Sequence, residues 1–300
     1  MGVADDLISL FFRQHPEAGL GELSLPELNK LLEDFKQKVN HAPDPDFDGL
    51  SPAQMYLLLH KPLSDNCILR FHHAMDQFVE QVPLFCLSEL LLAEIRSAGA
   101  LKLTAKGNLP VRTCALLYSQ DLIDWAYRKY VKRVREEEIP YLWPLKHYLL
   151  DRGIVKKRDN ALSLTNNGEQ LMRESKTARF KKLLFFFGER FHWGNFYGLE
   201  DDGVCGQLGW AYSLVLLGEY GGQARESEFY SQHWIQAFEK DSRENLNDES
   251  MLVYHRAYAV RFFECFACWF GLAELERKNH DKLIIKKSAL FERLFENQPV

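Results

Sequence analysis

Apolar residues recur at helical spacing along most of the chain. Residues 3–14 and 24–40 predict two amphipathic helices, because apolar side chains three and four positions apart share one face of a helix. Ser24 is the expected N-cap of the second helix, and Glu27 follows it at the spacing of a capping box. The same periodicity predicts further helices at 66–81, 122–135, 210–218, 229–239 and 251–271. We therefore expect a mainly α fold.

Helical spacing gives way to alternation within residues 143–171. An amphipathic segment ends at Gly153, and a short β-branched run follows it. A polar tip at 157–160 leads into the alternating residues 162–165, after which the chain re-enters a helix at 166–168. Alternation of apolar and polar residues is typical of a strand with one buried face. This stretch therefore predicts a helix, a β-hairpin and a second helix.

Two other stretches repeat the pattern with looser spacing. Residues 84–118 predict a helix, a glycine, a short strand, a turn and a helix. Residues 262–295 predict an apolar helix, a glycine, two strands and a last helix that begins after Ser288. Such a pattern indicates an internal repeat. We expect the sheet of the protein to be confined to three short hairpins, near 101–104, 153–165 and 272–286.

Helix, strand, polar hairpin, strand and helix follow one another in a winged helix. Residues 139–174 resemble that superfamily through the phrase GIVKK…LSLTNNGEQL, which is similar to the wing of many bacterial regulators. The stretches 84–118 and 262–295 resemble degenerate copies, since ALKLTAKG corresponds to ALSLTNNG. The resemblance implies tandem winged-helix-like modules with short β-hairpins and additional helices. The expected regions are a helical one at 1–83, two modules at 84–190, and a helical region with a third module at 191–300.

The rest of the chain resembles uncharacterised bacterial accessory regions that are found beside SEC-C or plasmid-type open-reading-frame domains. The strings GQLGWAYSLVLLGEYGG at 206–222 and LKLTAKGNLP at 101–110 carry this resemblance. It implies no known activity, and the SEC-C cysteine cluster is absent from the sequence, so its zinc is not carried over. The glycine- and aromatic-rich residues 188–209 are the expected hinge between the first two modules and the last.

Composition is that of an ordinary globular protein, with 46% hydrophobic and 26% charged residues in a chain of 300. No apolar run approaches the roughly 18 residues that a membrane span needs. Residues 1–12 lack a basic leader, so we expect neither a signal peptide nor a membrane segment. The six cysteines are scattered, mostly on apolar faces, which favours reduced thiols and a cytoplasmic location.

Charge is divided unevenly along the chain, whose formal net charge is -5. Residues 128–190 carry 16 Lys and Arg against 8 Asp and Glu, whereas residues 1–127 and 191–300 are acidic. A basic segment between acidic neighbours is typical of a surface that contacts phosphates. The candidate nucleic-acid-binding residues are Arg128, Lys129, Lys132, Arg133, Lys156, Lys157, Arg158, Lys181 and Lys182.

The helix ahead of the central hairpin does not favour direct reading of bases. It follows three glutamates at 136–138 and begins with the apolar residues 139–144, whereas base contacts use Arg, Asn, Gln or Ser. The corresponding helices of the other two stretches are acidic or rich in Phe. We therefore expect a non-catalytic scaffold or regulatory protein that acts through a protein partner or through self-association. The alternative is nucleic-acid binding through residues 128–190 and their wing.

One loop has part of a calcium-binding pattern. Asp44, Asp46 and Asp48 match the first ligand positions of an EF-hand loop, but Met55 occupies the position that needs a bidentate Glu. The motifs for phosphate loops, dinucleotides and nucleophile elbows are absent from the sequence. We expect this loop to be a polar turn.

Two further groups have the spacing of metal ligands. His72, Asp76 and Glu80 would share one face of the predicted helix at 66–81, which we interpret as a solvated face. Cys265 and Cys268 form a CxxC pair without the two further ligands of a zinc site, which favours core packing. We expect no catalytic residue, no cofactor, no structural metal and no small-molecule ligand.

Overall fold

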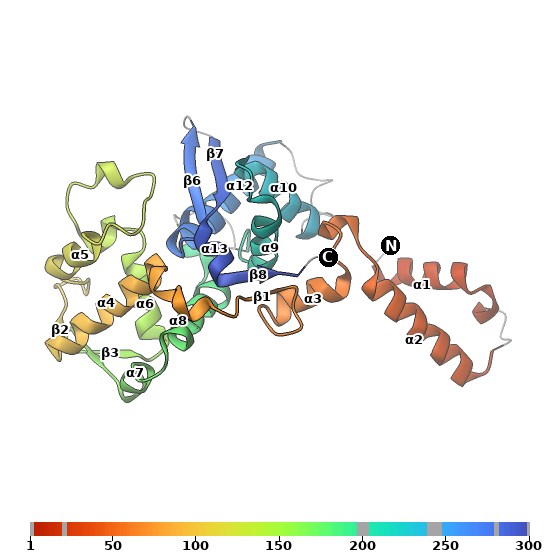
Figure 1. Ribbon diagram of the computed structural model, residues 1–300, viewed down its shortest axis with the longest axis horizontal. Coiled ribbons are helices and arrows are strands. Elements are labelled where there is room, and N and C mark those ends of the chain that lie inside the picture. Colours follow the sequence, from red (N-terminus) through yellow and green to blue (C-terminus); the bar gives the residue numbers. More distant parts are fainter. Residues whose placement is uncertain (1–2, 20–22, 197–203, 239–247, 279–281, 299–300) are drawn as a thin grey trace.

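Two groups of elements with the same connection order form most of the chain in the computed structural model (Figure 1), which describes residues 3–19, 23–196, 204–238, 248–278 and 282–298. We call these groups the first and the second unit. The first unit consists of α4 (Pro83–Ala98), β2 (Leu101–Lys102), α5 (Val111–Tyr118), α6 (Leu142–Asp151), β3 (Val155–Arg158) and β4 (Ala161–Leu164). The second consists of α9 (Trp210–Tyr220), β5 (Arg225–Glu226), α10 (Ser227–Phe238), α12 (Asp248–Tyr258) with the continuing π-helix η9 (Ala259–Ala267), β6 (Ala273–Lys278) and β7 (Lys282–Lys287).

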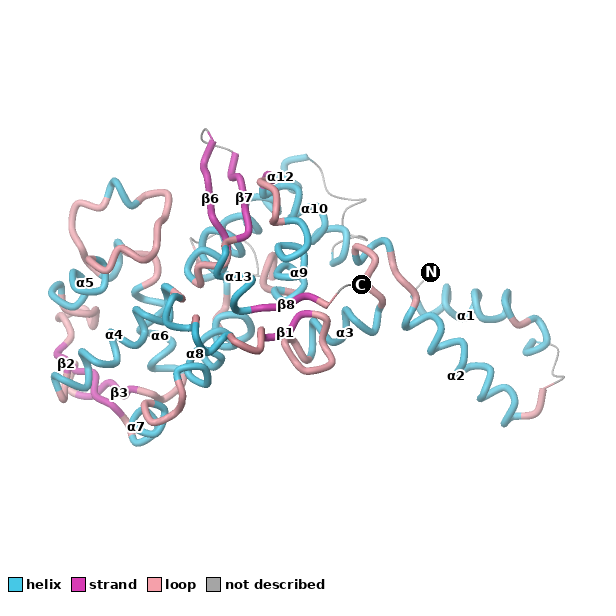
Figure 2. Tube along the Cα trace, viewed as in Figure 1, coloured by secondary structure: helices cyan, strands magenta, loops and turns pink. Residues whose placement is uncertain are grey.

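Each unit contains one antiparallel sheet of three strands, drawn in magenta in Figure 2. The strand orders are β2-β4-β3 and β5-β7-β6, so the last strand of each hairpin lies in the middle of its sheet. The registers also correspond. Leu101 pairs with Leu162 in the first sheet, and Arg225 pairs with Ile285 in the second. The two units therefore share topology as well as element order.

The protein is mainly α, as the sequence predicts, and no sheet in the described part of the chain exceeds three strands. The hairpins expected at 153–165 and 272–286 are confirmed as β3–β4 and β6–β7. The separate hairpin expected at 101–104 is wrong, because this strand pairs with β4 of the central stretch. Its pairing partner lies far along the sequence, and local alternation does not reveal such a partner.

A glycine in the left-handed region ends α6. Gly153 (φ 60°) donates its N–H to the Leu150 carbonyl at 3.0 Å, and the N–H of Ile154 reaches the Leu149 carbonyl at 2.9 Å. These two bonds form a Schellman motif. Thr165, just after β4, donates its hydroxyl to the Gly153 carbonyl at 2.6 Å and its N–H to the Ile154 carbonyl at 3.1 Å. Both ends of the hairpin are therefore fastened to the same corner.

The second unit repeats this corner bond for bond. Gly271 (φ 69°) donates its N–H to the Cys268 carbonyl at 2.9 Å, and Leu272 donates to the Ala267 carbonyl at 2.8 Å. Ser288, just after β7, donates its hydroxyl to the Gly271 carbonyl at 2.7 Å and its N–H to the Leu272 carbonyl at 3.0 Å. We call these two arrangements the Gly153 corner and the Gly271 corner.

Each corner hydroxyl also begins the next helix. Thr165 Oγ1 accepts the N–H of Gly168 at 3.0 Å at the start of α7 (Asn166–Leu171). Ser288 Oγ accepts the N–H of Phe291 at 3.2 Å at the start of α13 (Ala289–Leu294). An N-cap of this kind satisfies one of the free N–H groups of the first helical turn. The sequence prediction that Ser288 starts the last helix is confirmed.

Further elements follow the first unit, and a two-stranded sheet joins residues 69–71 to residues 295–297. After α7 come α8 (Lys176–Phe185), the π-helix η7 (Phe186–Arg190) and the turn η8 (Trp193–Asn195). Of the hinge expected at 188–209, residues 197–203 lie outside the described part of the chain. The last strand, β8 (Phe295–Asn297), pairs antiparallel with β1 (Leu69–Phe71), which precedes the first unit.

A helical hairpin at the N-terminal end projects from the rest of the molecule (Figure 1). It consists of α1 (Val3–Gln14), the turn η1 (Pro16–Gly19) and α2 (Leu25–His41), which confirm the helices expected at 3–14 and 24–40. Edge-to-face packing of Phe11 on Phe35, with ring centroids 5.2 Å apart, joins the two helices. The chain continues into η2 (Pro45–Phe47) and α3 (Pro52–His60). We call the hairpin formed by α1 and α2 the arm.

The core runs through both units and is rich in aromatic side chains. Trp193, Trp234 and Trp269 are fully buried, and the ring centroids of Trp193 and Phe266 lie 5.2 Å apart. Large rings bury more apolar surface than any other side chains and dominate the energetics of a core. Among the described residues, no helix combines the length and the apolar character that crossing a membrane requires.

Two helices expected from the sequence do not form. Residues 66–81 contain β1 and two short 3₁₀ turns, and residues 122–135 form an irregular segment with the turn η5 (Arg128–Tyr130). In the second case the buried side chains are those of Ile123 and Trp125. In a helix, the side chains of residues two positions apart point in different directions. In a strand they lie on the same face, so burial of both favours an extended conformation.

Candidate functional site

Three cations lie together on the exposed strand β3 of the central hairpin. Lys156, Lys157 and Arg158 are all exposed. The tip consists of Asp159 (φ 50°) and Asn160 (φ 54°), and positive φ at both residues is typical of a type I′ two-residue turn. Arg158 Nε lies 3.4 Å from the Asp159 carboxylate, but both side chains are more than four-fifths exposed, so this pair contributes little. We call this charged hairpin the wing.

The predicted residues Lys181 and Lys182 lie on α8, outside the wing, and both have partners within the chain. Lys182 Nζ is 2.5 Å from a carboxylate oxygen of Glu174, and Lys181 Nζ lies 4.4 Å from the ring centroid of Phe71. Two neighbouring cations of the helix are also paired, Lys176 with Glu80 and Arg179 with Glu89. Arg179 therefore links α8 to α4 and Lys176 links it to Glu80, whereas Lys182 pairs with a residue just ahead of its own helix.

The irregular segment 119–135 carries the other four predicted residues. Arg128 is paired with Asp121, and Lys129 Nζ lies 5.2 Å from the ring centroid of Tyr130. Lys132 and Arg133 are exposed. Arg128 and Lys129 also line an open hollow of about 480 Å³, whose other walls include Tyr118, Trp125 and Arg277 of β6. This hollow lies between the segment that carries Arg128 and strand β6 of the second unit. Its lining residues are not those of the wing.

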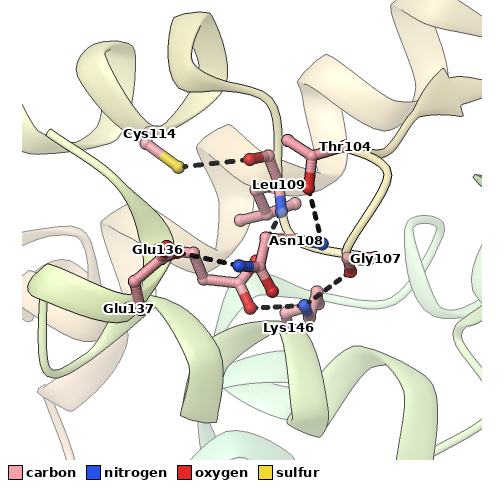
Figure 3. Close-up of polar contacts among 8 residues, drawn as sticks. All are labelled: Thr104, Gly107, Asn108, Leu109, Cys114, Glu136, Glu137 and Lys146. Carbon is pink, nitrogen blue, oxygen red and sulfur yellow. Dashed lines mark hydrogen bonds and ion pairs between the residues drawn. The ribbon is translucent and has the colours of Figure 1, made fainter.

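A buried ion pair connects this segment to α6 (Figure 3). Glu136, in the turn η6 (Glu136–Glu138), contacts the ammonium group of Lys146, and their side chains are 1% and 9% exposed. The other carboxylate oxygen of Glu136 accepts the N–H of Leu109 at 2.5 Å, and Lys146 Nζ donates to the Gly107 carbonyl at 3.1 Å. The carboxylate of Glu136 thus has two donors, and the ammonium group of Lys146 has two acceptors. Buried charges need such partners.

Around this pair, further polar groups hold the turn between β2 and α5. Asn108 donates its amide to Glu137 at 2.8 Å and its N–H to Thr104 Oγ1 at 3.1 Å. The Cys114 thiol donates to the Leu109 carbonyl at 3.7 Å. Burial, reinforced by the nearby carboxylates of Glu136 and Glu137, raises the pKa of Cys114 to about 12. The thiol stays protonated near neutral pH, so the cluster is an anchor for α6 and not a nucleophilic site.

Helix α6 buries a mainly apolar face and presents an aromatic ring at its start. Leu142, Leu145 and Tyr148 are buried. Trp143 is 40% exposed, stacks on His147 at 5.2 Å between ring centroids, and meets Phe191 at 5.9 Å. The first turn of this helix therefore offers the Trp143 ring to an approaching surface, and it contains no Arg, Asn, Gln or Ser.

The second unit contains a serine, a histidine and a glutamate in contact. Ser231 Oγ lies 2.6 Å from His255 Nδ1, and His255 Nε2 lies 3.9 Å from the Glu228 carboxylate. Ser231 is fully buried inside α10 and has the Glu228 carbonyl within hydrogen-bonding distance at 2.9 Å. Burial, only partly opposed by the charge of Glu228, lowers the pKa of His255. Because no substrate reaches a fully buried hydroxyl, this group packs α10 against α12.

The thiols of the CxxC pair belong to the core, as the sequence predicts. Cys265 is fully buried, and Cys268 Sγ donates to the Asp124 carbonyl at 3.2 Å. Burial raises the pKa of Cys268 to about 12 and that of Cys265 well above its ordinary value. Metal binding and thiol chemistry both use the thiolate, which is disfavoured at both positions.

Two carboxylates of the loop with part of the EF-hand pattern contact side chains of α9 and α10. Asp48 accepts the Tyr220 hydroxyl at 2.6 Å and lies 3.2 Å from His233 Nδ1. Asp46 accepts the Gln236 amide at 2.6 Å. Burial raises the pKa of Asp48, but the hydrogen bonds from His233 and Tyr220 outweigh it and leave this pKa below its usual value. The loop therefore joins the base of the arm to α9 and α10.

Comparison of the chain with models of protein families, with curated proteins and with solved structures found no match.

Replacing Lys146 by Met tests the buried ion pair. Removal of the ammonium group leaves the Glu136 carboxylate buried without a counter-charge, which we expect to cost about 3–5 kcal/mol in the free energy of unfolding. The double variant Lys146→Met/Glu136→Gln removes both charges but keeps an acceptor for Leu109, and it should recover most of this loss. Urea unfolding followed by circular dichroism measures both. Equal stability of Lys146→Met and the wild type would show that the pair does not anchor α6.

Proposed function

We propose that the protein is a non-catalytic scaffold, built of two winged-helix units, that acts through protein–protein contacts made by the arm. The observation that carries this proposal is the set of apolar side chains that the arm leaves exposed. Leu7, Ile8 and Phe12 of α1 are 40%, 56% and 46% exposed, and Leu25 of α2 is 76% exposed. A cluster of exposed apolar side chains is typical of a surface that binds another protein.

The architecture of the arm explains why these side chains lack cover within the chain. Phe11 and Phe35 fill the space between the two helices and are 4% and 6% exposed. Two helices enclose only one shared face, so apolar residues on the remaining faces need a further surface. The arm projects from the body (Figure 1), which leaves those faces accessible to a partner.

The connection order of both units supports the winged-helix assignment. Helix, strand, helix, helix, strand, strand, with the last strand in the middle of the sheet, is the order of a winged helix, and it occurs twice. In a DNA-binding winged helix, the helix before the hairpin enters the major groove. Here that helix is α6, and Trp143 is exposed at its start. The Glu136–Lys146 pair anchors the helix to the body. This arrangement favours a structural use of the fold.

The arm variant Ile8→Glu/Phe12→Glu tests the proposed function. Two charges on the apolar surface should lower the affinity for partner proteins by about a hundredfold or more, since each buried charge costs at least about 1.4 kcal/mol at an interface. The matched control is Leu252→Glu, which changes an equally apolar side chain, 67% exposed, on α12.

The readout is affinity capture from a lysate of the source cells, quantified by mass spectrometry, together with sedimentation of the purified protein to detect self-association. Proteins that the wild type and Leu252→Glu capture should be depleted with the arm variant. Capture of the same proteins in equal amounts by all three, with all three monomeric in sedimentation, would contradict the proposal.

The wing supports a second candidate function, which is sequence-independent nucleic-acid binding. Its three exposed cations lie on one strand next to a tight turn, whereas the cations of α8 are paired internally. Contacts between such cations and phosphates release counterions, so affinity falls as salt concentration rises.

The variant Lys156→Ala/Lys157→Ala/Arg158→Ala tests this candidate. If the wing contacts DNA, loss of three phosphate contacts should reduce the slope of log affinity against log salt by up to about 3, for all sequences alike. Fluorescence anisotropy with mixed-sequence duplex DNA measures the slope. The control Lys176→Ala/Lys182→Ala removes cations that already have carboxylate partners and should leave it unchanged. Identical slopes for the wing variant and the wild type would exclude the wing as a contact.

A further inference from the structure

Two imidazoles and a carboxylate converge where β8 pairs with β1. One ligand atom each from His72, His73 and Glu296 lies within 4.8 Å of the other two. His72 is half-buried, whereas His73 and Glu296 lie at the surface. The sequence prediction placed His72 on a helix face with Asp76 and Glu80. That expectation is wrong, because residues 66–81 form no such helix and the third group comes from the last strand of the chain.

Strand pairing fixes the positions of two of these side chains. Arg70 of β1 is paired with Glu296 of β8, and the N–H of His72 reaches the Leu294 carbonyl at 2.9 Å. Alternate residues of a strand point to the same face. His72 therefore lies on the same face as Arg70, diagonally opposite Glu296. Cross-strand diagonal neighbours are within reach of long side chains.

The turn after β1 returns the second imidazole to this face. His73 follows His72 directly, and their ring centroids are 4.3 Å apart. The N–H of Ala74 donates to His72 Nδ1 at 3.2 Å, so Nε2 is the nitrogen of this ring that remains for a ligand bond. On the other face of the strand pair, the rings of Phe71 and Phe295 stack 5.8 Å apart and support the site from below.

We propose that His72, His73 and Glu296 bind a zinc ion that fastens β8 to β1. Imidazole nitrogens and a carboxylate oxygen are ligands that Zn²⁺ prefers, whereas Mg²⁺ and Ca²⁺ prefer sets of oxygen ligands. Ligand atoms at the usual zinc distances of about 2.0–2.2 Å lie roughly 3.3–3.6 Å apart. The three side chains therefore need only small rotations to close on one ion. Three protein ligands leave a fourth tetrahedral position for water.

Coordination through His72 Nε2 requires a rearrangement of one proton. With Nδ1 accepting the Ala74 N–H, the neutral ring carries its hydrogen on Nε2. Metal binding at Nε2 moves that hydrogen to Nδ1, so the long hydrogen bond from Ala74 is given up for a coordinate bond. Arg70, beside Glu296, donates its Nε–H to the Cys67 carbonyl, and its charge opposes the cation. We therefore expect weaker binding than at a structural site with four protein ligands.

The ion would link two segments that lie far apart in the sequence, at 72–73 and 296. β8 contributes only three residues to its sheet, and it is the last strand of the chain. Because the ligands meet only in the folded protein, zinc binds the native state in preference to the unfolded chain and raises its stability by mass action. The proposed zinc site contains no residue of the arm or the wing, so its test does not depend on the proposed function.

Isothermal titration of the tag-free, full-length protein with zinc chloride tests the site, after treatment with a chelator and its removal. We expect one zinc ion per chain. His73→Ala and Glu296→Gln should each lower the affinity by about tenfold or more, because each removes a ligand atom. The control His192→Ala changes an exposed histidine outside the site and should bind as the wild type does. Circular dichroism confirms that the variants are folded.

A second readout separates this site from binding at the free cysteines. Saturating zinc should raise the thermal unfolding midpoint of the wild type and of His192→Ala, but not that of His73→Ala/Glu296→Gln. Magnesium should shift none of the midpoints. Two results would overturn the proposal: no zinc binding by the wild type, or binding and stabilisation that are the same in the wild type and the double variant.

Discussion

A helix that ends at a left-handed glycine sets the geometry of each unit. At the Gly153 corner, the positive φ turns the chain out of α6, and the two bonds of the Schellman motif fix the direction in which β3 leaves. Glycine adopts this conformation at the lowest cost because it has no Cβ. Thr165 then returns to the carbonyls of Gly153 and Ile154, so the hairpin is closed at its base by the same residues that start it. The central position of β4 in its sheet, and the start of α7, depend on this closure.

The same corner supports two units of different character. In the first unit, the helix before the corner is anchored by the buried Glu136–Lys146 pair, and the hairpin carries the exposed cations of the wing. In the second, that helix includes the π-helix η9, whose rings belong to the aromatic core, and cations of its hairpin are paired with Glu226 and Glu264. The first unit therefore supplies a charged surface, whereas the second supplies packing, and β8, which follows it, pairs with β1.

Local features of the sequence predict the parts of the fold that depend on interactions between residues close together in the chain. The corner glycines, the alternation of β3 and β4, and the cap Ser288 each act within a few residues, and the elements they predict are present. Pairings between distant segments were missed. The strand at 101–104 joins β4, and Glu296 meets His72, through contacts that no local pattern encodes. For the same reason the charge count located the wing but also included Lys181 and Lys182, whose partners become evident only once α8 is placed in the fold.

The same corner, used twice, closes the hairpin of each unit. Removal of the two corner hydroxyl groups, one at a time, tests this most directly. Thr165→Val and Ser288→Ala each remove a helix cap and a bond to the corner carbonyl, and each should lower the free energy of unfolding by about 1–2 kcal/mol. The exposed control Gln170→Ala on α7 should stay within about 0.5 kcal/mol of the wild type. Urea unfolding of the three variants gives these values. A clear loss for one hydroxyl with none for the other would contradict the equivalence of the two corners.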